Sequence, residues 1–208
     1  MTRANPFQVP GLPESPRRGE LAQVEAARGG DRAAQSELLR RHYALIHATA
    51  FRLLGNHEDA EDLAQECFVR AFRSLAFFRG QGSFAGWLRR IVVHLAQDWY
   101  RSRGRRVAPV GLPEELAGGR EPHGVIEGRE LRVTLADALE ALGATLRVAL
   151  LLRTREGLEY EAIAELTGVT PETARTRVMK ARKHLMRMLG PYLDESSRAP
   201  RSRGRSAP

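Results

Sequence analysis

The chain has 208 residues, 42% of them hydrophobic, and a formal net charge of +8. This composition allows one or two small cores, and the basic excess fits either a nucleic-acid or other anionic partner or solubility alone. The single cysteine excludes an internal disulfide framework, and no apolar run approaches the roughly 20 residues that a membrane span requires. Since the proline-rich N-terminus lacks a secretion signal, we expect a cytoplasmic protein with no direct membrane insertion.

Changes in composition divide the chain into five segments. Residues 1–20 are rich in Pro, Gly and Arg without periodicity and predict a disordered arm, and residues 190–208 predict a disordered basic tail. Residues 107–130 hold three prolines and five acids against two arginines, which predicts a flexible acidic linker. The remaining blocks, residues 21–106 and 131–189, are both basic, and we expect each to form one small domain.

Helical periodicity dominates both blocks, and no strand pattern competes with it. In the first block, apolar residues recur at helical spacing over 60–75 and 84–99, and less cleanly over 39–54. The second block predicts helices around 131–142 and 146–155, followed by a closing pair. The chain is therefore predicted to be all-α, with three or four packed helices in its first domain.

The closing pair has the sequence of a helix-turn-helix. Its first helix begins at Tyr160 and stops before Gly168, a residue that readily adopts the left-handed conformation. Thr170 is a suitable N-cap, and Pro171 suits the first position of the next helix, where a missing N–H costs nothing. The spacing therefore predicts a helix-turn-helix whose second helix covers residues 171–189.

The second helix of this pair separates its side chains by face. An apolar stripe, which should face the core, comprises Ala174, Val178, Ala181, Leu185 and Met188. The other sides carry five cations, the chemistry of a recognition helix in a DNA major groove, although a solvated basic face is the alternative. The candidate DNA-binding residues are Thr173, Arg175, Thr176, Arg177, Met179, Lys180, Arg182 and Lys183.

Two features of the first block have two interpretations each. Five carboxylates crowd residues 58–66, either as a solvated helix start favoured by the helix dipole or as a docking surface for a basic partner. Along the following helix, a polar stripe with adjoining arginines runs beside aromatic residues. This pattern fits either core packing with a solvated helix end or the binding of single-stranded bases. Its members are Trp87, Arg90, His94, Gln97, Asp98, Arg101 and Arg103.

The sequence shows no sign of catalysis. The six histidines and Cys67, which falls on an apolar stripe, show no metal-ligand spacing, and phosphate-binding and nucleophile motifs are absent. We therefore expect no enzyme, no catalytic or metal site, no cofactor and no small-molecule substrate. A helix-turn-helix regulator that binds duplex operators independently of polymerase is the rival class. It explains residues 131–189 but leaves residues 58–106 without a role.

Two segments resemble a known family. DAEDLAQECFVRAFRSLAFFRGQGSFAGWLRRIVVHLAQDWYRSRGRR is similar to domain two of the sigma-70 family, extracytoplasmic-function (ECF) group. LRTREGLEYEAIAELTGVTPETARTRVMKARKHLMRML is similar to that group's domain four. The resemblance covers residues 35–106 and 131–189, in the expected order, with a linker in place of domain three. It implies a sigma factor that binds core RNA polymerase and directs promoter-specific initiation.

The resemblance also implies a role for each set of residues. The acidic helix would dock on the clamp helices of the largest polymerase subunit, the polar stripe would melt and read the −10 element, and the helix-turn-helix would read the −35 element. The flap region of the polymerase and an anti-sigma factor are further expected partners. Many relatives carry Asn at the position of His94, so no −10 base preference is implied there. The implied docking residues are Asp59, Asp62, Gln65 and Glu66.

Overall fold

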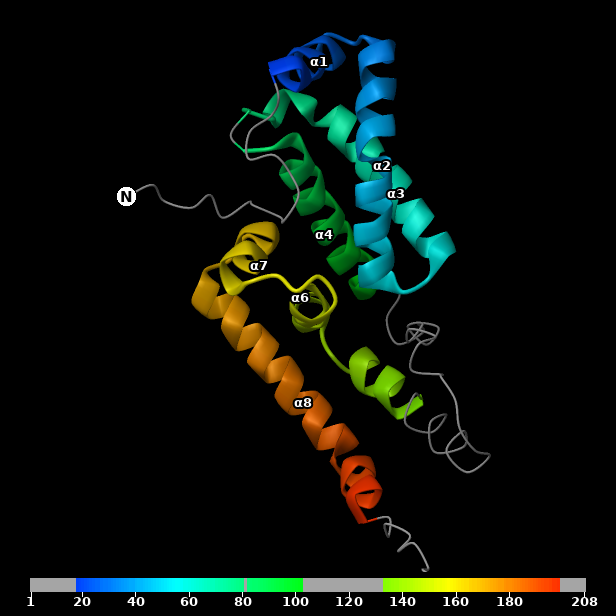
Figure 1. The fold of residues 1–208 in the computed structure, drawn as a ribbon, viewed down its shortest axis with the longest axis vertical. Coiled ribbons are helices and arrows are strands. Elements are labelled where there is room, and N and C mark those ends of the chain that lie inside the picture. The colour runs from blue at the N-terminus through cyan, green and yellow to red at the C-terminus, as the bar shows by residue number, and fades with distance from the viewer. Residues whose placement is uncertain (1–17, 81, 103–132, 199–208) are drawn as a thin grey trace, which may run out of the picture.

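The computed structural model of the protein describes residues 18–80, 82–102 and 133–198. Every regular element within these ranges is helical, as the periodicity predicted, and the helices form two packed groups (Figure 1). None of the helices in these ranges combines the length and the apolar character that crossing a membrane requires. The predicted linker, together with residues 1–17 and 199–208 of the predicted arm and tail, lies outside the described residues.

The first helical group begins with two helices that pack on each other. α1 (Arg18–Arg28) and α2 (Arg32–Leu54) are joined by a short turn in which the Asp31 carboxylate accepts hydrogen bonds from two N–H groups of the first turn of α2. Gly55 ends α2 with a φ of 75°, the left-handed conformation that favours glycine. Both ends of this helix are therefore fixed by local chemistry.

α3 (His57–Arg73), the 3-10 helix η1 (Leu75–Phe77) and α4 (Phe84–Ser102) complete the first group. α2, α3 and α4 contact one another, and α1 packs on α2. The core between them contains aromatic as well as aliphatic side chains, and the ring centroids of Phe78 and Phe84 lie 5.4 Å apart.

The periodicity of the sequence does not predict α1, and its first three residues fall in the predicted arm. Two long-range contacts hold this helix. His42 Nε2 lies 2.9 Å from Glu20 Oε1, and Arg28 Nη2 donates to the carbonyl oxygen of Phe78 at 2.6 Å. Because α1 is stabilised by residues distant in the sequence, its local pattern gives little sign of it.

Burial on α2 differs by one position from the predicted stripe. Leu38 is fully buried, whereas Leu39, which the spacing placed in the stripe, is 38% exposed. Ile46 and Ala50 face the core as predicted. Leu38 and Leu39 precede Ile46 by eight and seven residues, and an amphipathic helix can place either spacing on its buried face. The spacing alone therefore does not show which leucine is buried.

The second helical group consists of a helical stretch over residues 133–140 followed by α6 (Ala144–Thr154), α7 (Tyr160–Thr167) and α8 (Pro171–Arg198). α8 packs on both α6 and α7. The fully buried side chains described in this group are aliphatic or small, apart from a few polar residues. The group therefore has a core without a buried aromatic ring among its described residues.

α8 is longer than predicted. The predicted tail begins at Gly190, but the helix continues through Gly190 and Pro191 to Arg198. Adding turns to an existing helix requires no new nucleation step. Gly190 and Pro191 therefore lower the helix propensity of this stretch of α8 without ending the helix. Met188, predicted in the core stripe, is 37% exposed because this part of α8 runs beyond α6 and α7 (Figure 1).

The two groups pack against each other. α4 contacts both α6 and α7, and α2 contacts α6. α6 and α7 thus lie between α4 and α8 (Figure 1). One side of α4, a helix that carries candidate DNA-binding residues, is therefore covered by the second group.

Candidate nucleic-acid and protein interfaces

The turn between α7 and α8 has the geometry that the sequence predicts. Gly168 has a φ of 69°, and the Val169 N–H donates to the Ala164 carbonyl oxygen at 2.9 Å. The Thr170 hydroxyl accepts from the Thr173 N–H at 3.2 Å, which caps the start of α8. The helix-turn-helix is therefore confirmed, and it fixes the face of α8 that turns outward.

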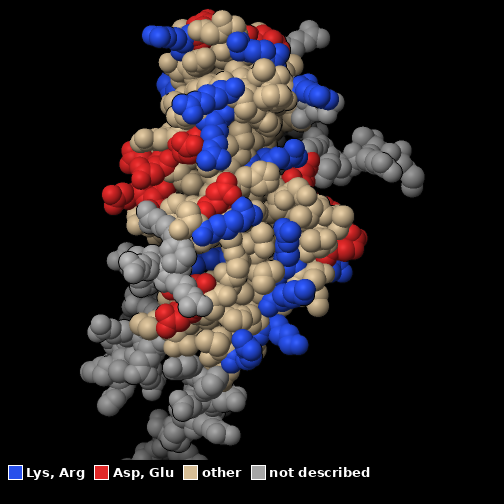
Figure 2. Space-filling view, turned by 180° about the vertical axis from the view of Figure 1, so that it is seen from behind, with Lys and Arg blue, Asp and Glu red and all other residues tan. Residues whose placement is uncertain are grey.

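The outward face of α8 carries the predicted cations. The core side is closed by Ala174, Val178 and Ala181, which are fully buried. Cations follow the helix along the lower right of Figure 2. Within the described residues, the five predicted cations make no ion pair with a carboxylate. Of the candidate set, Thr173 and Arg177 are half-buried, and the exposed members are Arg175, Thr176, Met179, Lys180, Arg182 and Lys183.

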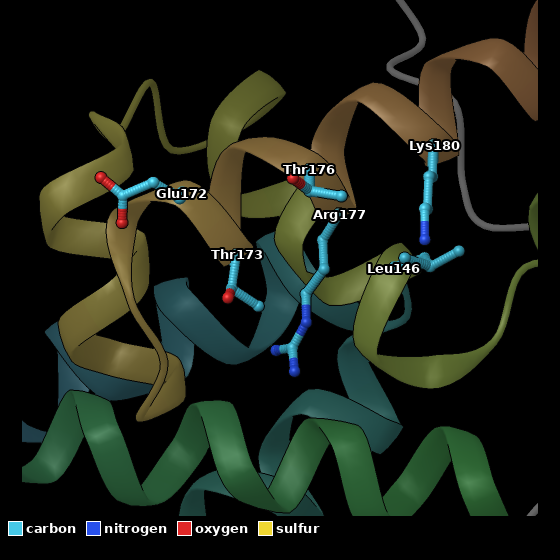
Figure 3. A pocket seen from close by; sticks show the side chains of 6 residues that line it. All are labelled: Leu146, Glu172, Thr173, Thr176, Arg177 and Lys180. Carbon is cyan, nitrogen blue, oxygen red and sulfur yellow. The ribbon is translucent and has the colours of Figure 1, made fainter.

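An open hollow of about 370 Å³ lies beside the first half of α8. In Figure 3, Arg177 and Lys180 extend to the same side of α8, with Leu146 of α6 close to the end of Lys180. A shallow cationic surface of this kind suits a phosphate group or a base edge better than an enclosed small molecule. The lining residues are Leu146, Glu172, Thr173, Thr176, Arg177 and Lys180.

Arg175 is oriented by an aromatic ring. Its guanidinium carbon lies 5.1 Å from the ring centroid of Tyr160 on α7, and Arg153 approaches the same ring at 5.0 Å. Such cation–π contacts stabilise one arrangement of a long side chain. The contact therefore restrains the cation nearest the start of the recognition helix.

The four predicted docking residues lie on one side of α3. Asp62, Gln65 and Glu66 are exposed, and Asp59 is half-buried in the first turn. Figure 2 shows acidic side chains gathered at the left edge of that view, where the first half of α3 lies. Carboxylates in this setting are accessible to a basic partner, as the docking interpretation requires.

A chain of exposed ion pairs links this acidic side of α3 to α4. Arg70 Nε lies 2.7 Å from Glu66 Oε1, and Arg70 Nη1 lies 3.8 Å from Asp98 Oδ2. Asp98 Oδ1 in turn lies 2.6 Å from Arg101 Nη1. Each pair is about half exposed and contributes about 0–1 kcal/mol. The predicted docking and −10 surfaces are thus adjacent, which the sequence did not reveal.

The predicted −10 residues divide into a group that is buried or paired with another helix and an open group. Gln97 is only 6% exposed, and Arg90 Nη2 lies 3.5 Å from Glu165 Oε1 of α7. Arg90 thus contacts the second helical group, although 42% of its side chain is exposed. The open group comprises His94, Asp98 and Arg101.

Trp87 is half-buried and packs within the first helical group. Its ring centroid lies 5.3 Å from that of Phe78 and 5.6 Å from that of Phe84. Core packing is therefore one role of this side chain, as its place beside the apolar stripe predicted. Arg103, the last member of the predicted set, lies outside the described residues.

The covering side chains come from α6 and the turn that follows it. Glu156, whose side chain is 7% exposed, forms ion pairs with Arg52 of α2 and, at 3.1 Å, with Nη2 of Arg89 on α4. Arg147 of α6 lies over the ring of Tyr100 on α4 at 4.2 Å. Sequence reasoning missed all of these residues, because contacts between elements so far apart leave no local pattern.

Burial dominates the pKa shifts along this contact. It lowers the pKa of Arg89, although Glu156 opposes the shift, and it raises the pKa of Glu165, although Arg90 opposes it. Burial also raises the pKa of Tyr100. In each case the loss of water disfavours the charged form by more than the neighbouring charge favours it.

The described residues contain no group of three or more side chains arranged to hold a metal ion. Cys67 is buried, as its place on the apolar stripe predicted, and its Sγ donates to the Leu88 carbonyl oxygen at 3.5 Å. Burial raises the pKa of this thiol to about 12. Cys67 is therefore a core residue.

Comparison with known families identifies both helical groups. A model of sigma-70 region 2 matches residues 38–106, and a model of sigma-70, region 4 matches residues 132–185. The ECF RNA polymerase sigma factor SigE of Mycolicibacterium smegmatis is 37% identical over 177 residues, covering 82% of this chain and 68% of the relative. The RNA polymerase sigma-H factor of Pseudomonas aeruginosa is 32% identical over 183 residues, covering 83% and 95%. The chain belongs to the ECF group of the sigma-70 family.

Two solved structures share the fold. One is the sigma factor RpoE in complex with the anti-sigma factor NepR from Bartonella quintana, with a TM-score of 0.50 and 24% identity, covering 74% of this chain and 96% of that one. The other is CnrH in complex with the cytosolic domain of CnrY, with a TM-score of 0.52 and 24% identity, covering 83% and 97%.

Family membership establishes the function. The protein is a sigma factor, which binds core RNA polymerase and directs transcription from specific promoters. Its family consists of initiation factors and not of enzymes. The alternative, a helix-turn-helix regulator that acts independently of polymerase, is thereby excluded. The first helical group corresponds to sigma domain 2 and the second to sigma domain 4, and both are named accordingly.

Proposed function

We propose that three separate surfaces divide the work of this sigma factor: α3 docks on the polymerase, α4 reads the −10 element and α8 reads the −35 element. The observation that carries the proposal is the separation of charge between the domains. Exposed carboxylates lie on α3, whereas cations without carboxylate partners among the described residues lie on α8. The first surface complements a basic protein, and the second complements DNA.

The docking surface is assigned to the clamp helices of the largest polymerase subunit. Asp62, Gln65 and Glu66 are exposed, and the ion pair between Glu66 and Arg70 is itself about half exposed. A surface with several carboxylates can steer a basic partner into register. The residues of this surface are Asp59, Asp62, Gln65 and Glu66.

The −35 surface divides along α8. In a helix-turn-helix, residues near the start of the recognition helix contact base edges. Arg175, Thr176 and Met179 occupy this part, and all three are exposed. The later cations, Arg182 and Lys183, are placed to contact phosphates and to hold the helix in the groove.

The −10 surface lies on α4, where aromatic, polar and cationic side chains adjoin. His94 and Arg101 are exposed, Arg101 in a surface ion pair with Asp98, and Trp87 presents a half-buried ring on the same helix. Stacking on rings combined with cationic contacts is how proteins hold single-stranded DNA. Arg90 and Gln97 belong to the same surface, but Arg90 is paired with Glu165 of domain 4 and Gln97 is buried.

Two further partners belong to the proposal. The flap region of the polymerase would receive domain 4, and an anti-sigma factor would hold the protein inactive. The second expectation is supported by the two solved structures with this fold, each of which is a complex with another protein, named as an anti-sigma factor in the case of NepR.

Reconstitution with core polymerase and genome-wide mapping of transcription starts tests the proposal. We expect starts that share one −35 and one −10 motif. Replacing Arg177 and Lys180 together with Ala should abolish these starts without loss of polymerase binding. Arg187→Ala is the matched control, because Arg187 lies exposed on the same helix outside the candidate set. Starts without a common motif, or equal losses in both variants, would contradict the assignment.

A further inference from the structure

A single arginine of α1 holds η1, the short helix that precedes α4. Arg28, in the last turn of α1, donates from Nη2 to the Phe78 carbonyl oxygen at 2.6 Å and from Nε to the Leu75 carbonyl oxygen at 3.4 Å. Its Nη1 lies 2.7 Å from Glu25 Oε1, which orients the guanidinium on the same helix. The backbone is therefore held at the first residue of η1 and just after its last residue. We name these contacts the Arg28 clamp.

η1 depends on contacts from outside for its position. A 3-10 helix of three residues has poor hydrogen-bond geometry and leaves most of its backbone groups without internal partners. Leu75 and Phe78 are buried, but Phe77 between them is 79% exposed, so the core anchors this segment on one side only. A cation at the last carbonyl groups of a helix satisfies these acceptors. The clamp therefore fixes the point at which the chain leaves η1.

α1 also contacts the turn that follows η1. Gly80 in this turn has a φ of 71°, and Leu21 Cδ2 lies 3.6 Å from the point where a Cβ atom on Gly80 would be. That distance is an ordinary van der Waals contact. Leu21 and Arg28 stand two turns apart on α1, about 10 Å along its axis. The helix thus supports η1 and the turn after it at two separate points.

The clamped backbone leads to an aromatic residue of the proposed −10 surface. The Phe78 side chain is buried, and its ring centroid lies 5.3 Å from that of Trp87 on α4. Aromatic rings at this separation favour particular relative orientations. Because Arg28 holds the Phe78 carbonyl group, it also fixes the ring on which Trp87 packs. One residue therefore connects α1 with the Trp87 ring.

We propose that Arg28 is a positioning residue for promoter reading: the Arg28 clamp sets η1, and Phe78 then holds the Trp87 ring in the orientation that meets an unpaired −10 base. The inference rests on the proposed function for the role of Trp87. Arg28 acts through the backbone and needs no contact with DNA. A lysine in its place would keep the charge but lacks the planar fork of donors, so it would hold only one of the two carbonyl oxygens.

Tryptophan fluorescence tests the clamp without polymerase or DNA. The chain has two tryptophans, so Trp99→Phe leaves Trp87 as the only one. In this background, Arg28→Met should shift the Trp87 emission to longer wavelength, because a displaced Phe78 ring lets water reach the indole. Methionine keeps an apolar stem and removes every donor of the arginine. Arg28→Lys should shift the emission in the same direction by a smaller amount.

Glu20→Gln is the matched control for the attachment of α1. Glu20 lies 2.9 Å from His42 Nε2, a contact that joins α1 to α2 and does not involve η1. This variant should leave the Trp87 emission unchanged, and circular dichroism reports the helical content of every variant. Wild-type emission in folded Arg28→Met would overturn the clamp, as would an equal shift in Glu20→Gln. If Arg28→Met fails to fold, wild-type emission in Arg28→Lys would overturn it instead.

Transcription with core polymerase from a randomised −10 library tests the effect on promoter reading. Arg28→Met should lower initiation at the native promoter about tenfold and flatten the −10 base preference, because it removes charge-assisted hydrogen bonds. Arg28→Lys should recover part of both, and Glu20→Gln should keep the wild-type preference. An unchanged −10 preference in a variant with shifted Trp87 emission would overturn the positioning role. Failure of the proposed function would appear as wild-type starts without a common −10 motif, and it would leave the fluorescence result intact.

Discussion

α4 and α8 both carry cations proposed to bind DNA, yet the two helices differ in what surrounds those cations. On α8 the five candidate cations have no carboxylate partner within the described residues, and four of them are exposed. On α4 Arg89 is buried against Glu156, Arg90 pairs with Glu165 and Arg101 pairs with Asp98. The two helices thus differ in the partners of their cations as well as in the number of cations they carry. Under the proposed assignment, the cations of α8 could meet DNA directly, whereas those of α4 would exchange protein carboxylates for nucleic acid.

The two domains also differ in the side chains that fill their cores. Domain 2 is packed around aromatic rings such as Phe78 and Phe84, and domain 4 around aliphatic side chains such as Leu152 and Val178. Aromatic rings bury more surface for each residue. Domain 2 should therefore depend more strongly on single core residues.

The largest effect tests this contrast between the cores. Phe84 is fully buried, so Phe84→Ala should destabilise domain 2 by about 3–5 kcal/mol. Urea unfolding followed by circular dichroism should show an early transition for domain 2, with domain 4 unfolding later. Leu152→Ala, expected to cost about 2–5 kcal/mol, should affect domain 4 instead. A single transition that both variants shift equally would show that the domains unfold as one unit.

Reversal of the α3 charges sharpens the contrast between protein-binding and DNA-binding surfaces. Asp62→Arg with Glu66→Arg should cost about 2–5 kcal/mol of core polymerase binding, because like charges would face each other across the interface. Both side chains are exposed, so the fold should survive. Titration against core enzyme measures the loss, with reversal of Glu25 and Glu37 as the control in the same domain. Unchanged affinity for core enzyme would show that the carboxylates of residues 58–66 are only a solvated helix start.

Two substitutions on α8 separate base reading from phosphate contact. Arg175→Ala should lose about 1–3 kcal/mol at one −35 base pair and relax the preference there. Lys183→Ala should weaken binding to all sequences alike and reduce the salt dependence by about one unit of slope. Affinities over a promoter library at several salt concentrations measure both effects. Uniform losses in both variants would show that this division of α8 is wrong.

His94 probes the open group of predicted −10 residues on α4. It is exposed and lies outside the contact with domain 4. An imidazole and an amide offer different hydrogen-bonding groups, so His94→Asn should shift the −10 preference by about 1–3 kcal/mol on the native promoter. Polymerase binding and −35 contacts should not change. Transcription from a randomised −10 library measures this shift. Identical base preferences for the wild type and His94→Asn would show that His94 does not read the −10 element.

The smallest expected effect is a pH dependence confined to domain 2. Burial lowers the pKa of His42 from its ordinary value of 6.5, while Glu20 opposes the shift and Arg41 adds to it. The unfolded state then binds more protons than the folded state, so stability should fall as pH drops through 6.5 toward the lowered pKa. Urea midpoints at about pH 8 and about pH 5.5 measure the difference. His42→Gln should reduce it, and an undiminished dependence would place its source elsewhere.

Local features were predictable from the sequence to the extent that neighbouring residues determine them. Gly168, Thr170 and Pro171 define the helix-turn-helix through their own conformational preferences, and the structure confirms each. α1 and the ion pairs of Glu156 were not predictable, because the residues that hold them lie far away in the sequence. The docking, −10 and −35 assignments came from family resemblance, because the residues alone left a solvated surface as an alternative in each case.

The buried thiol of Cys67 has a consequence for signalling. Thiol oxidation proceeds through the thiolate, and with a pKa of about 12 only about one thiol in 10⁵ is ionised at neutral pH. The sulfur is also fully buried in domain 2, and it is the single cysteine of the chain. Peroxides and other thiol oxidants therefore find no reactive cysteine on the folded protein. A stress signal based on cysteine chemistry would have to be sensed by another molecule and passed to this sigma factor through binding.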